Sequence, residues 1–287
     1  MRLILLLLVG FATLAPVSAT AQMSRTRADV NRPVEELFWA PTVIGTASVT
    51  NLDAGDLNFS IKHAFGLVSS GIENLYGLDG AANIRFGLDY GATDWLSLGF
   101  GRSRFDKVYD FRFKTNLLRQ TVSGSSPLEV AVMGDMGVTT LENGFSFNDR
   151  LSYAGMIMLG RRLSEKVSVQ VSPMVSHFNT VYIERNNNGD VVAEENTHFG
   201  AAVALNLKIN EVVAVLVEYV PVFGERTDGT VDAFSVGLDI ETGGHVFQLF
   251  FGSSDWLTEQ HLLARNNDDF FAGDFRWGFN VNRVFGL

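Results

Sequence analysis

Cysteine is absent from the chain, and basic residues are outnumbered by acidic ones, 22 against 32, for a net charge of −10. The absence of cysteine excludes disulfide bonds, thiolate metal sites and a lipid-modified N-terminal cysteine. The deficit of basic residues argues against nucleic-acid partners, which select basic surfaces. Long apolar runs are also missing after the N-terminal segment, so no stretch reaches the roughly 18 residues that a membrane-spanning helix needs.

Catalytic signatures are missing as well. The sequence contains no Gly-x-Ser-x-Gly, no His-Glu-x-x-His, no Walker A motif and no Gly-x-Gly-x-x-Gly. Ser176 and His177 are adjacent, so on a strand they face opposite sides and cannot act as a pair. Ser60 and His63 are three positions apart, so on a strand they also face opposite sides. The five histidines are scattered, and we expect no enzyme activity, no metal site and no cofactor.

The N-terminus has the order of a secretory signal peptide. Arg2 precedes an apolar run over residues 3–14, and small residues at 19–21 provide a cleavage site. The alternative is a membrane anchor helix, but the apolar run is too short to span a bilayer. We therefore expect residues 1–21 to be removed on export.

The last segment of the chain, 275–287, alternates between bulky apolar and mostly polar or small residues, with Arg283 as the one exception on the apolar face. Side chains alternate across a strand, so this segment has one apolar face and one polar face. Its length suits a tilted strand that crosses a bilayer, which needs about 9–11 residues. An aromatic strand at the C-terminus also resembles the assembly signal of outer-membrane barrels. The candidate signal residues are Phe275, Trp277, Phe279, Val281, Phe285 and Leu287.

The same period of two repeats along the chain, and helical periodicity is not convincing anywhere. Short and long connections alternate, as the periplasmic turns and external loops of outer-membrane barrels do. A periplasmic lead-in at 22–56 contains one extra short strand, 43–49, outside the even count. This segment is either an extra strand at the rim or a lead-in tucked into the lumen. The predicted fold is all-β, a transmembrane antiparallel up-and-down barrel of twelve strands over 57–287. The predicted strands are 57–66, 82–91, 96–101, 109–118, 128–138, 150–163, 166–178, 197–209, 212–224, 231–241, 245–252 and 275–286.

A soluble β-sandwich is the alternative fold, because its strands alternate as well. Here the polar face mixes glycine, alanine and serine with charged residues, which suits a crowded lumen. The apolar face is almost free of charge in all twelve predicted strands, as a lipid-facing surface requires. With the export signal, this favours a barrel in the outer membrane of a Gram-negative-type bacterium, in contact with lipid and with the barrel-assembly machinery.

Charged side chains of both signs lie on the predicted lumen face. A barrel of about twelve strands falls between small filled barrels and open porins. Buried charges are costly unless paired, so cross-strand pairing is one interpretation and a charged path for solutes is the other. The turn after strand 109–118 predicts Arg112 beside Asp135, with Lys114 and Glu129 as diagonal neighbours. The lumen-lining candidates are Lys62, Arg85, Asp89, Arg112, Lys114, Glu129, Asp135, Glu218, Asp239 and Arg276.

Two smaller features have competing interpretations. Residues 184–195 partly match the ligand spacing of an EF-hand calcium loop, but the first position is glutamate and strands flank it. Asn188-Gly189 favours a hairpin tip instead. Aromatic residues such as Trp95 and Tyr153 suit the interfacial girdles of a membrane barrel rather than a sugar-stacking platform.

A set of short runs stands out between residues 37 and 120. They include Phe38-Trp39-Ala40-Pro41, Arg85-Phe86-Gly87-Leu88-Asp89-Tyr90-Gly91 and Gly99-Phe100-Gly101-Arg102-Ser103. Taken in their order and spacing, these runs resemble an uncharacterised family of bacterial outer-membrane β-barrel proteins, known only as a domain of unknown function. The resemblance implies an outer-membrane barrel and supplies no substrate.

The predicted function is passive or gated passage of small solutes through a narrow lumen of paired charges. The alternative is a non-conducting structural or interaction barrel whose acidic external loops, 73–79, 184–195 and 255–274, bind a partner. A wide pore with unpaired charge of one sign would favour transport. A dry, fully paired lumen would favour the interaction role.

Overall fold

The computed structural model describes residues 31–287, with the exception of 182, 186–190 and 194. The expected signal peptide and the centre of the EF-hand-like loop lie outside the described residues. Within the described part of the chain, no helix is long and apolar enough to cross a membrane.

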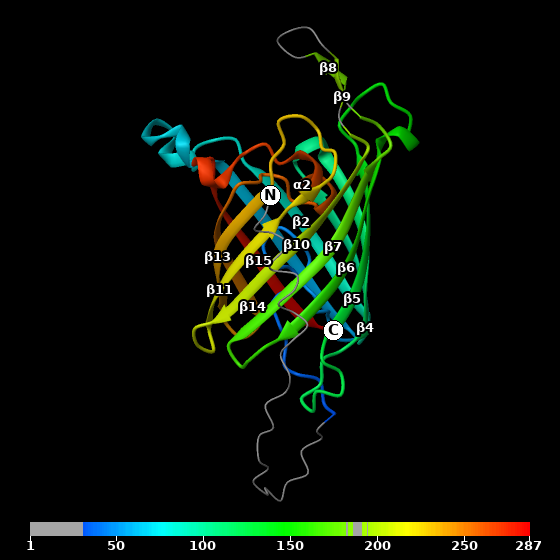
Figure 1. Cartoon of the computed structure of the whole chain (residues 1–287), viewed down its shortest axis with the longest axis vertical. Coiled ribbons are helices and arrows are strands. Elements are labelled where there is room, and N and C mark those ends of the chain that lie inside the picture. Colours follow the sequence, from blue (N-terminus) through cyan, green and yellow to red (C-terminus); the bar gives the residue numbers. More distant parts are fainter. Residues whose placement is uncertain (1–30, 182, 186–190, 194) are drawn as a thin grey trace, which may run out of the picture. The chain divides into compact units, whose positions relative to one another are not determined.

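Over the described residues, thirteen strand segments form a single antiparallel sheet that closes on itself (Figure 1). Closure comes from the pairing of β1 with β15 and of β10 with β11. Segments β11 and β12 both pair with β10 and are separated at Pro221, which has no N–H to donate to a ladder. They form one barrel strand, so the described chain makes the twelve-stranded barrel that the sequence predicts. The bounds are β1 (Asp56–Leu67), β2 (Asn83–Thr93), β3 (Leu96–Ser103), β4 (Val108–Leu118), β5 (Glu129–Thr139), β6 (Leu151–Arg162), β7 (Val167–Phe178), β10 (Thr197–Lys208), β11 (Val213–Val220), β12 (Val222–Phe223), β13 (Ala233–Glu241), β14 (His245–Gly252) and β15 (Arg276–Gly286).

The outer face of the barrel is apolar because alternate side chains of each strand point away from the lumen. On β15, Trp277 and Phe285 are 40% and 43% exposed, whereas Arg276 and Asn280, at even positions of the same strand, are at most 3% exposed. The other candidate signal residues follow the same parity: Phe279 and Val281 are half-buried, and Phe275 and Leu287 flank the strand. Trp95 and Tyr153 are also exposed on the outside.

The two ends of the barrel differ in the length of their connections (Figure 1). At one end, here called the turn end, strands are joined at 94–95, 163–166, 209–212 and 242–244, and β1 begins beside the end of β15. The longer β4–β5 connection, 119–128, lies at the same end. The opposite end, here called the loop end, carries the longest connections, together with the short one at 104–107. One of them contains the separate pair β8 (Ile183–Arg185) and β9 (Val191–Ala193), which is antiparallel as the hairpin interpretation requires. Its tip lies outside the described residues.

Residues 31–55, here called the N-terminal plug, enter the barrel from the turn end. Val34 N donates to Gln120 O at 2.9 Å in the β4–β5 connection, which fixes the point of entry. Further along, Leu37, Phe38 and Ile44 are at most 2% exposed and join the apolar core inside the barrel. The plug is therefore part of the lumen and not a periplasmic lead-in.

The extra strand expected at 43–49 is wrong. These residues form a turn closed by Val43 N and Thr46 O at 2.8 Å, and Thr42 and Ala47 make only an isolated bridge. The reason is closure of the barrel, because its strands are already paired on both sides and offer this segment no ladder. The backbone of the segment is satisfied by side chains of the barrel wall instead.

Residues 253–275, here called the loop plug, fold back into the barrel from the loop end. Their helix α2 (Glu259–Arg265) has six consecutive buried residues, from Glu259 to Ala264. This corrects the expectation that 255–274 is an external loop offered to a partner. Its two leucines enter the lumen core, and its polar residues pair with the wall. Short 3-10 helices complete the described chain: η1 (Val68–Ser70), η2 (Ile72–Gly77), η3 (Phe105–Lys107), η4 (Asn148–Arg150) and η5 (Phe270–Ala272).

Candidate functional site: a charged cluster between two plugs

A compact group of buried charges lies on the inward faces of β2, β4 and β5. Arg85 holds Asp110 through two nitrogens, with Nε at 2.9 Å from Oδ1. Arg112 lies 3.5 Å from both Asp110 and Asp135. From the loop plug, Glu259 Oε2 approaches Arg112 to 3.3 Å. All five side chains are at most 8% exposed. This charged cluster is the candidate functional site.

Two glycines of β3 make the cluster geometrically feasible. The strand lies between β2 and β4, so Arg85 has to cross it to reach Asp110. A Cβ on Gly101 would lie 2.5 Å from Arg85 Cζ, and one on Gly99 would lie 2.8 Å from Arg112 Cδ. Glycine at these two inward positions leaves the space in which the arginine side chains lie.

The register prediction for Arg112 agrees with the structure, since Arg112 stands directly opposite Asp135. The diagonal pairing of Lys114 with Glu129 is not what the structure has. Lys114 Nζ donates to the carbonyl oxygens of Ser48, at 3.2 Å, and Thr50 in the N-terminal plug. Glu129 accepts a bond from Asn116, a member of its neighbouring strand. The plug occupies the space between the two predicted partners.

The remaining lumen candidates all point inward, and most of them bind a plug. Glu218 and Lys62 bind the N-terminal plug at Gly45, where Gly45 N donates to Glu218 at 2.6 Å and Lys62 Nζ donates to Gly45 O at 2.9 Å. Arg276 pairs with Asp255, at 2.9 Å, and Asp268 of the loop plug. Asp239 accepts a bond from Gln248, and Asp89 lies 3.4 Å from Asn58.

Uncharged amides of the wall, which the sequence interpretation missed, satisfy much of the N-terminal plug backbone. Gln170 accepts from Val49 N at 2.7 Å, and Asn280 donates to Ile44 O at 2.9 Å. Gln248 and Asn206 make equivalent bonds to the plug. Irregular backbone at membrane depth is tolerated only where such partners exist. In the sequence, asparagine and glutamine at inward positions of the predicted strands were the signal that could have indicated these bonds.

Glu259 and Gln260 were also missed, because the sequence places them in a loop. The signal was a run of helix formers, Glu259 to Arg265, with two leucines in its centre. In the structure Gln260 donates to Asp135 at 3.2 Å, so α2 touches two members of the wall cluster through consecutive side chains. Leu262 meets the other plug at Gly45. The two plugs thus contact each other inside the barrel.

Two titratable groups on the loop plug respond to this environment in different ways. Burial raises the pKa of Glu259, but the charges of Arg112, Lys62 and Arg85 outweigh burial and hold it below its usual value. Glu259 therefore stays ionised. Burial, reinforced by the charge of Arg265, lowers the pKa of His261 well below its usual value. His261 is neutral in the barrel, stacked on Trp256 and bonded to Thr258 at 2.7 Å.

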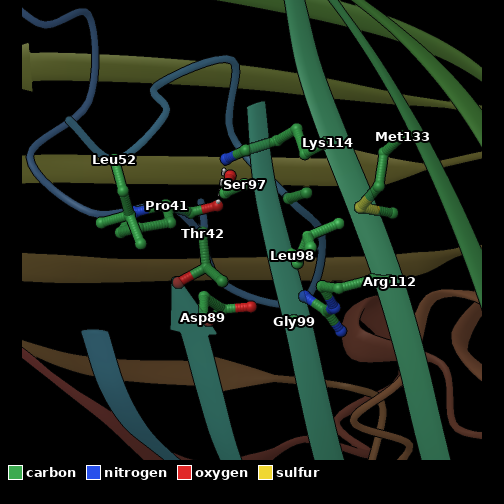
Figure 2. A pocket seen from close by; sticks show the side chains of 11 residues that line it. Pro41, Thr42, Leu52, Asp89, Ser97, Leu98, Gly99, Arg112, Lys114 and Met133 are labelled. Carbon is green, nitrogen blue, oxygen red and sulfur yellow. Dashed lines mark hydrogen bonds between the residues drawn. The ribbon is translucent and has the colours of Figure 1, made fainter. Parts of the chain in front are cut away.

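Hollows of different size border the two plugs. A cavity of about 20 Å³ borders Asp89, Arg112 and Lys114, and Figure 2 shows these side chains around it. A wider hollow of about 300 Å³ opens at the turn end. Pro41 and Leu52 of the N-terminal plug border both spaces and separate them. At the loop end, a further hollow of about 20 Å³ is lined by Ser152, which Gln260 contacts, and by Arg265.

A closed antiparallel barrel of twelve strands over the described residues, with an apolar outer face and a charged lumen, is the architecture of outer-membrane porins and channels. The fold is similar to that of the NanC porin, with a TM-score of 0.50 and 8% identity over 80% of this chain and 99% of the porin. It is also similar to the COG4313 outer membrane channel from Pseudomonas putida F1, with a TM-score of 0.52 and 14% identity over 82% of this chain and 97% of the channel.

The chain belongs to the membrane-bound β-barrel domain family DUF5777, whose model matches residues 38–285. This confirms the family resemblance seen in the sequence. The protein is a membrane β-barrel, in contact with lipid, and is similar to Gram-negative outer-membrane proteins. A comparison with curated protein sequences finds no significant match. The family match begins inside the N-terminal plug, at Phe38, so residues 38–55 of the plug are included with the barrel in the family domain.

Proposed function

We propose that this barrel is a gated channel that passes small charged solutes along the charged side of its lumen, and that the loop plug is the gate. One observation carries the proposal: hollows lie at the turn end, in the centre and at the loop end of the lumen, and plug residues border each of them. Pro41 and Leu52 separate the turn-end hollow from the central cavity. Helix α2 lies between Arg112, which borders the central cavity, and Ser152, which borders the loop-end hollow.

The chemistry along this path suits ions rather than apolar solutes. Asp89, Arg112 and Lys114 border the central cavity, and Glu36 and Glu241 border the turn-end hollow. A cavity of about 20 Å³ is close to the size that holds a single water. The barrel as it stands is therefore closed to solutes, and passage requires displacement of a plug. In outer-membrane barrels short turns are periplasmic, so the loop plug would open toward the outside.

Conductance of the purified full-length protein in planar bilayers tests the proposal. One variant replaces residues 257–266 with a Gly-Ser segment of equal length, and a control replaces the exposed segment 72–76, which borders none of the three hollows, in the same way. We expect brief, rare openings from the unmodified protein and from the control, because α2 closes the path in both. We expect sustained conductance from the variant that lacks α2. A folded barrel that lacks α2 and still carries no current would contradict the proposal.

A non-conducting interaction barrel is the second candidate, and a specific feature of the β1–β2 connection favours it. Ile72, Leu75, Tyr76 and Leu78 are all at least 50% exposed at the loop end. Leu75 and Tyr76 have φ of 47° and 53°, a conformation that is costly for residues with a side chain. The partner surface would then be the apolar part of the predicted loop 73–79 and not its acidic part. Absence of current from the variant without α2 would favour this role.

A further inference from the structure

Glu259 is the one carboxylate of the charged cluster that does not belong to the barrel wall. Asp110 and Asp135 are fixed on β4 and β5, whereas Glu259 comes from the loop plug. It is fully buried and reaches Arg112 at 3.3 Å. Lys62, which binds the N-terminal plug, is not a member of the charged cluster but interacts electrostatically with Glu259. Counted with it, three positive side chains, Lys62, Arg85 and Arg112, face the three carboxylates Asp110, Asp135 and Glu259. Displacement of α2 would leave this part of the wall with one positive charge in excess.

The contact between Glu259 and Arg112 is incomplete. Arginine holds a carboxylate best through two parallel N–H bonds. Here only one oxygen of Glu259 has a hydrogen-bond partner, while Oε1 is buried without one. Arg112 Nε makes no hydrogen bond either, although it lies 3.5 Å from Asp135. Buried polar atoms without partners carry a cost, so a carboxylate that is free to orient itself would bind Arg112 better than the tethered one.

The central cavity gives such a carboxylate a place. Arg112 borders this cavity together with Lys114, and Figure 2 shows α2 lying beside Arg112 in the same view. If Glu259 withdraws, the volume of its side chain joins the cavity at the guanidinium. Arg85 cannot replace Arg112 in this role, because Nε and Nη2 of Arg85 already donate to the two oxygens of Asp110.

We propose that Arg112 is a binding site for the carboxylate of a small anionic solute, and that Glu259 occupies this site in the closed barrel as a tethered substitute. The proposal deepens the gated passage proposed above and rests on it for its biological meaning. An incoming carboxylate displaces Glu259 and thereby releases α2. The substrate class is then small organic anions, recognised by arginine geometry and by the positive charge that appears when Glu259 leaves.

The test uses isothermal titration of the purified full-length protein in detergent, with glucuronate as the probe and glucose as its uncharged counterpart. Glu259→Gln keeps the shape of the side chain and removes its charge, so the competitor for Arg112 is lost. We expect Glu259→Gln to bind glucuronate at least tenfold more tightly than the unmodified protein, and neither to bind glucose. Glu142→Gln, an equivalent change on an exposed loop-end residue, is the matched control and should leave binding unchanged.

A second variant separates a carboxylate site from a general change in the lumen. Arg112→Lys in the Glu259→Gln background keeps the positive charge and loses the paired N–H groups, so binding of glucuronate should weaken at least tenfold. Equal affinities of Glu259→Gln and the unmodified protein for glucuronate would overturn the site, as would equal binding of glucose. If the variant without α2 conducts while Glu259→Gln gains no affinity, the channel stands and the carboxylate site falls. If Glu259→Gln gains affinity while no variant conducts, the carboxylate site stands and the channel falls.

Discussion

The two plugs fill one lumen from opposite ends, yet they are held by different kinds of contact. The N-terminal plug has its backbone bonded to wall side chains, among them Gln170, Glu218 and Asn280, and buries a row of apolar residues. The loop plug is held chiefly by side-chain contacts to charged groups, such as Glu259 with Arg112 and Gln260 with Asp135.

The completeness of the bonding differs as well. The three donors of the turn at Gly45 and Thr46 all reach Glu218, at 2.5–3.1 Å. At the loop plug, by contrast, the carboxylate oxygen Glu259 Oε1 is buried without a partner. Each plug also has a buried amide atom without one, Asn51 Nδ2 in the N-terminal plug and Gln260 Oε1 in the loop plug. A segment whose backbone is tied to the wall resembles part of the core, while one attached by imperfect ion pairs can be exchanged for another ligand or for water. In the proposed channel, this difference distinguishes the N-terminal plug, as a permanent filling, from the loop plug, as the gate.

The largest expected loss of stability comes from replacing the apolar part of the N-terminal plug. Replacing residues 37–50 with a Gly-Ser segment of equal length exposes the apolar part of the lumen wall. Five large buried apolar side chains at about 2 kcal/mol each give a loss of stability on the order of 10 kcal/mol. Replacing 257–266, which carries three buried leucines, should cost about half as much. The stability of both variants is measured in lipid vesicles as the urea midpoint at which the heat-modifiable folded form is lost. Equal losses of stability from the two replacements would contradict the difference between the two plugs.

A single carboxylate from each region gives a smaller and sharper contrast. Glu218→Ala leaves the buried N–H groups of Gly45 and Thr46 without acceptors, at a cost of about 3 kcal/mol. Glu259→Ala leaves Arg112 still beside two wall carboxylates, so we expect a cost of about 1 kcal/mol. The exposed Glu142→Ala serves as a reference and should change the urea midpoint very little. A larger loss from Glu259→Ala than from Glu218→Ala would reverse the assignment of filling and gate.

Acidification should weaken the docking of the loop plug, and this is the smallest of the expected effects. Burial and the charge of Arg265 lower the pKa of His261 in the docked loop, partly opposed by Asp110, while in a released loop it returns toward 6.5. Docking is therefore favoured above pH 6.5 and weakened as the pH falls, because the released loop binds the proton. The shift is at most about tenfold per pH unit. Open probability measured between about pH 7.5 and 5.5 should rise on acidification.

The control for this dependence is His261→Gln, which keeps a hydrogen-bonding group beside Thr258 and does not titrate in this range. Its open probability should vary less with pH than that of the unmodified protein. An identical pH profile for the two proteins would assign the response to another group and remove His261 from the description of the gate.

The barrel itself could be predicted from the sequence because its signal is local. Alternation along β15 separates the outward Trp277 and Phe285 from the inward Arg276 and Asn280 without reference to any other strand. The register between two strands that follow each other in the chain depends almost only on nearby residues as well. The prediction that Arg112 faces Asp135 required only neighbouring strands and agrees with the ladder, although the connection is ten residues long.

The contents of the lumen were decided only by the tertiary structure. Gly45 and Glu218 are 173 residues apart in the chain, and Arg112 and Glu259 are 147 apart. Nothing in the local pattern of 43–49 distinguishes a strand from a turn whose backbone will be bonded by the wall, since alternation is the same in both. Nor does a polar loop indicate that its glutamate will meet an arginine inside the barrel. The sequence by itself determined which face of each strand meets lipid, because that depends on side-chain parity. Closure of the barrel decided which segments fill it, because only closure brings the buried charges and amides of distant strands to one place.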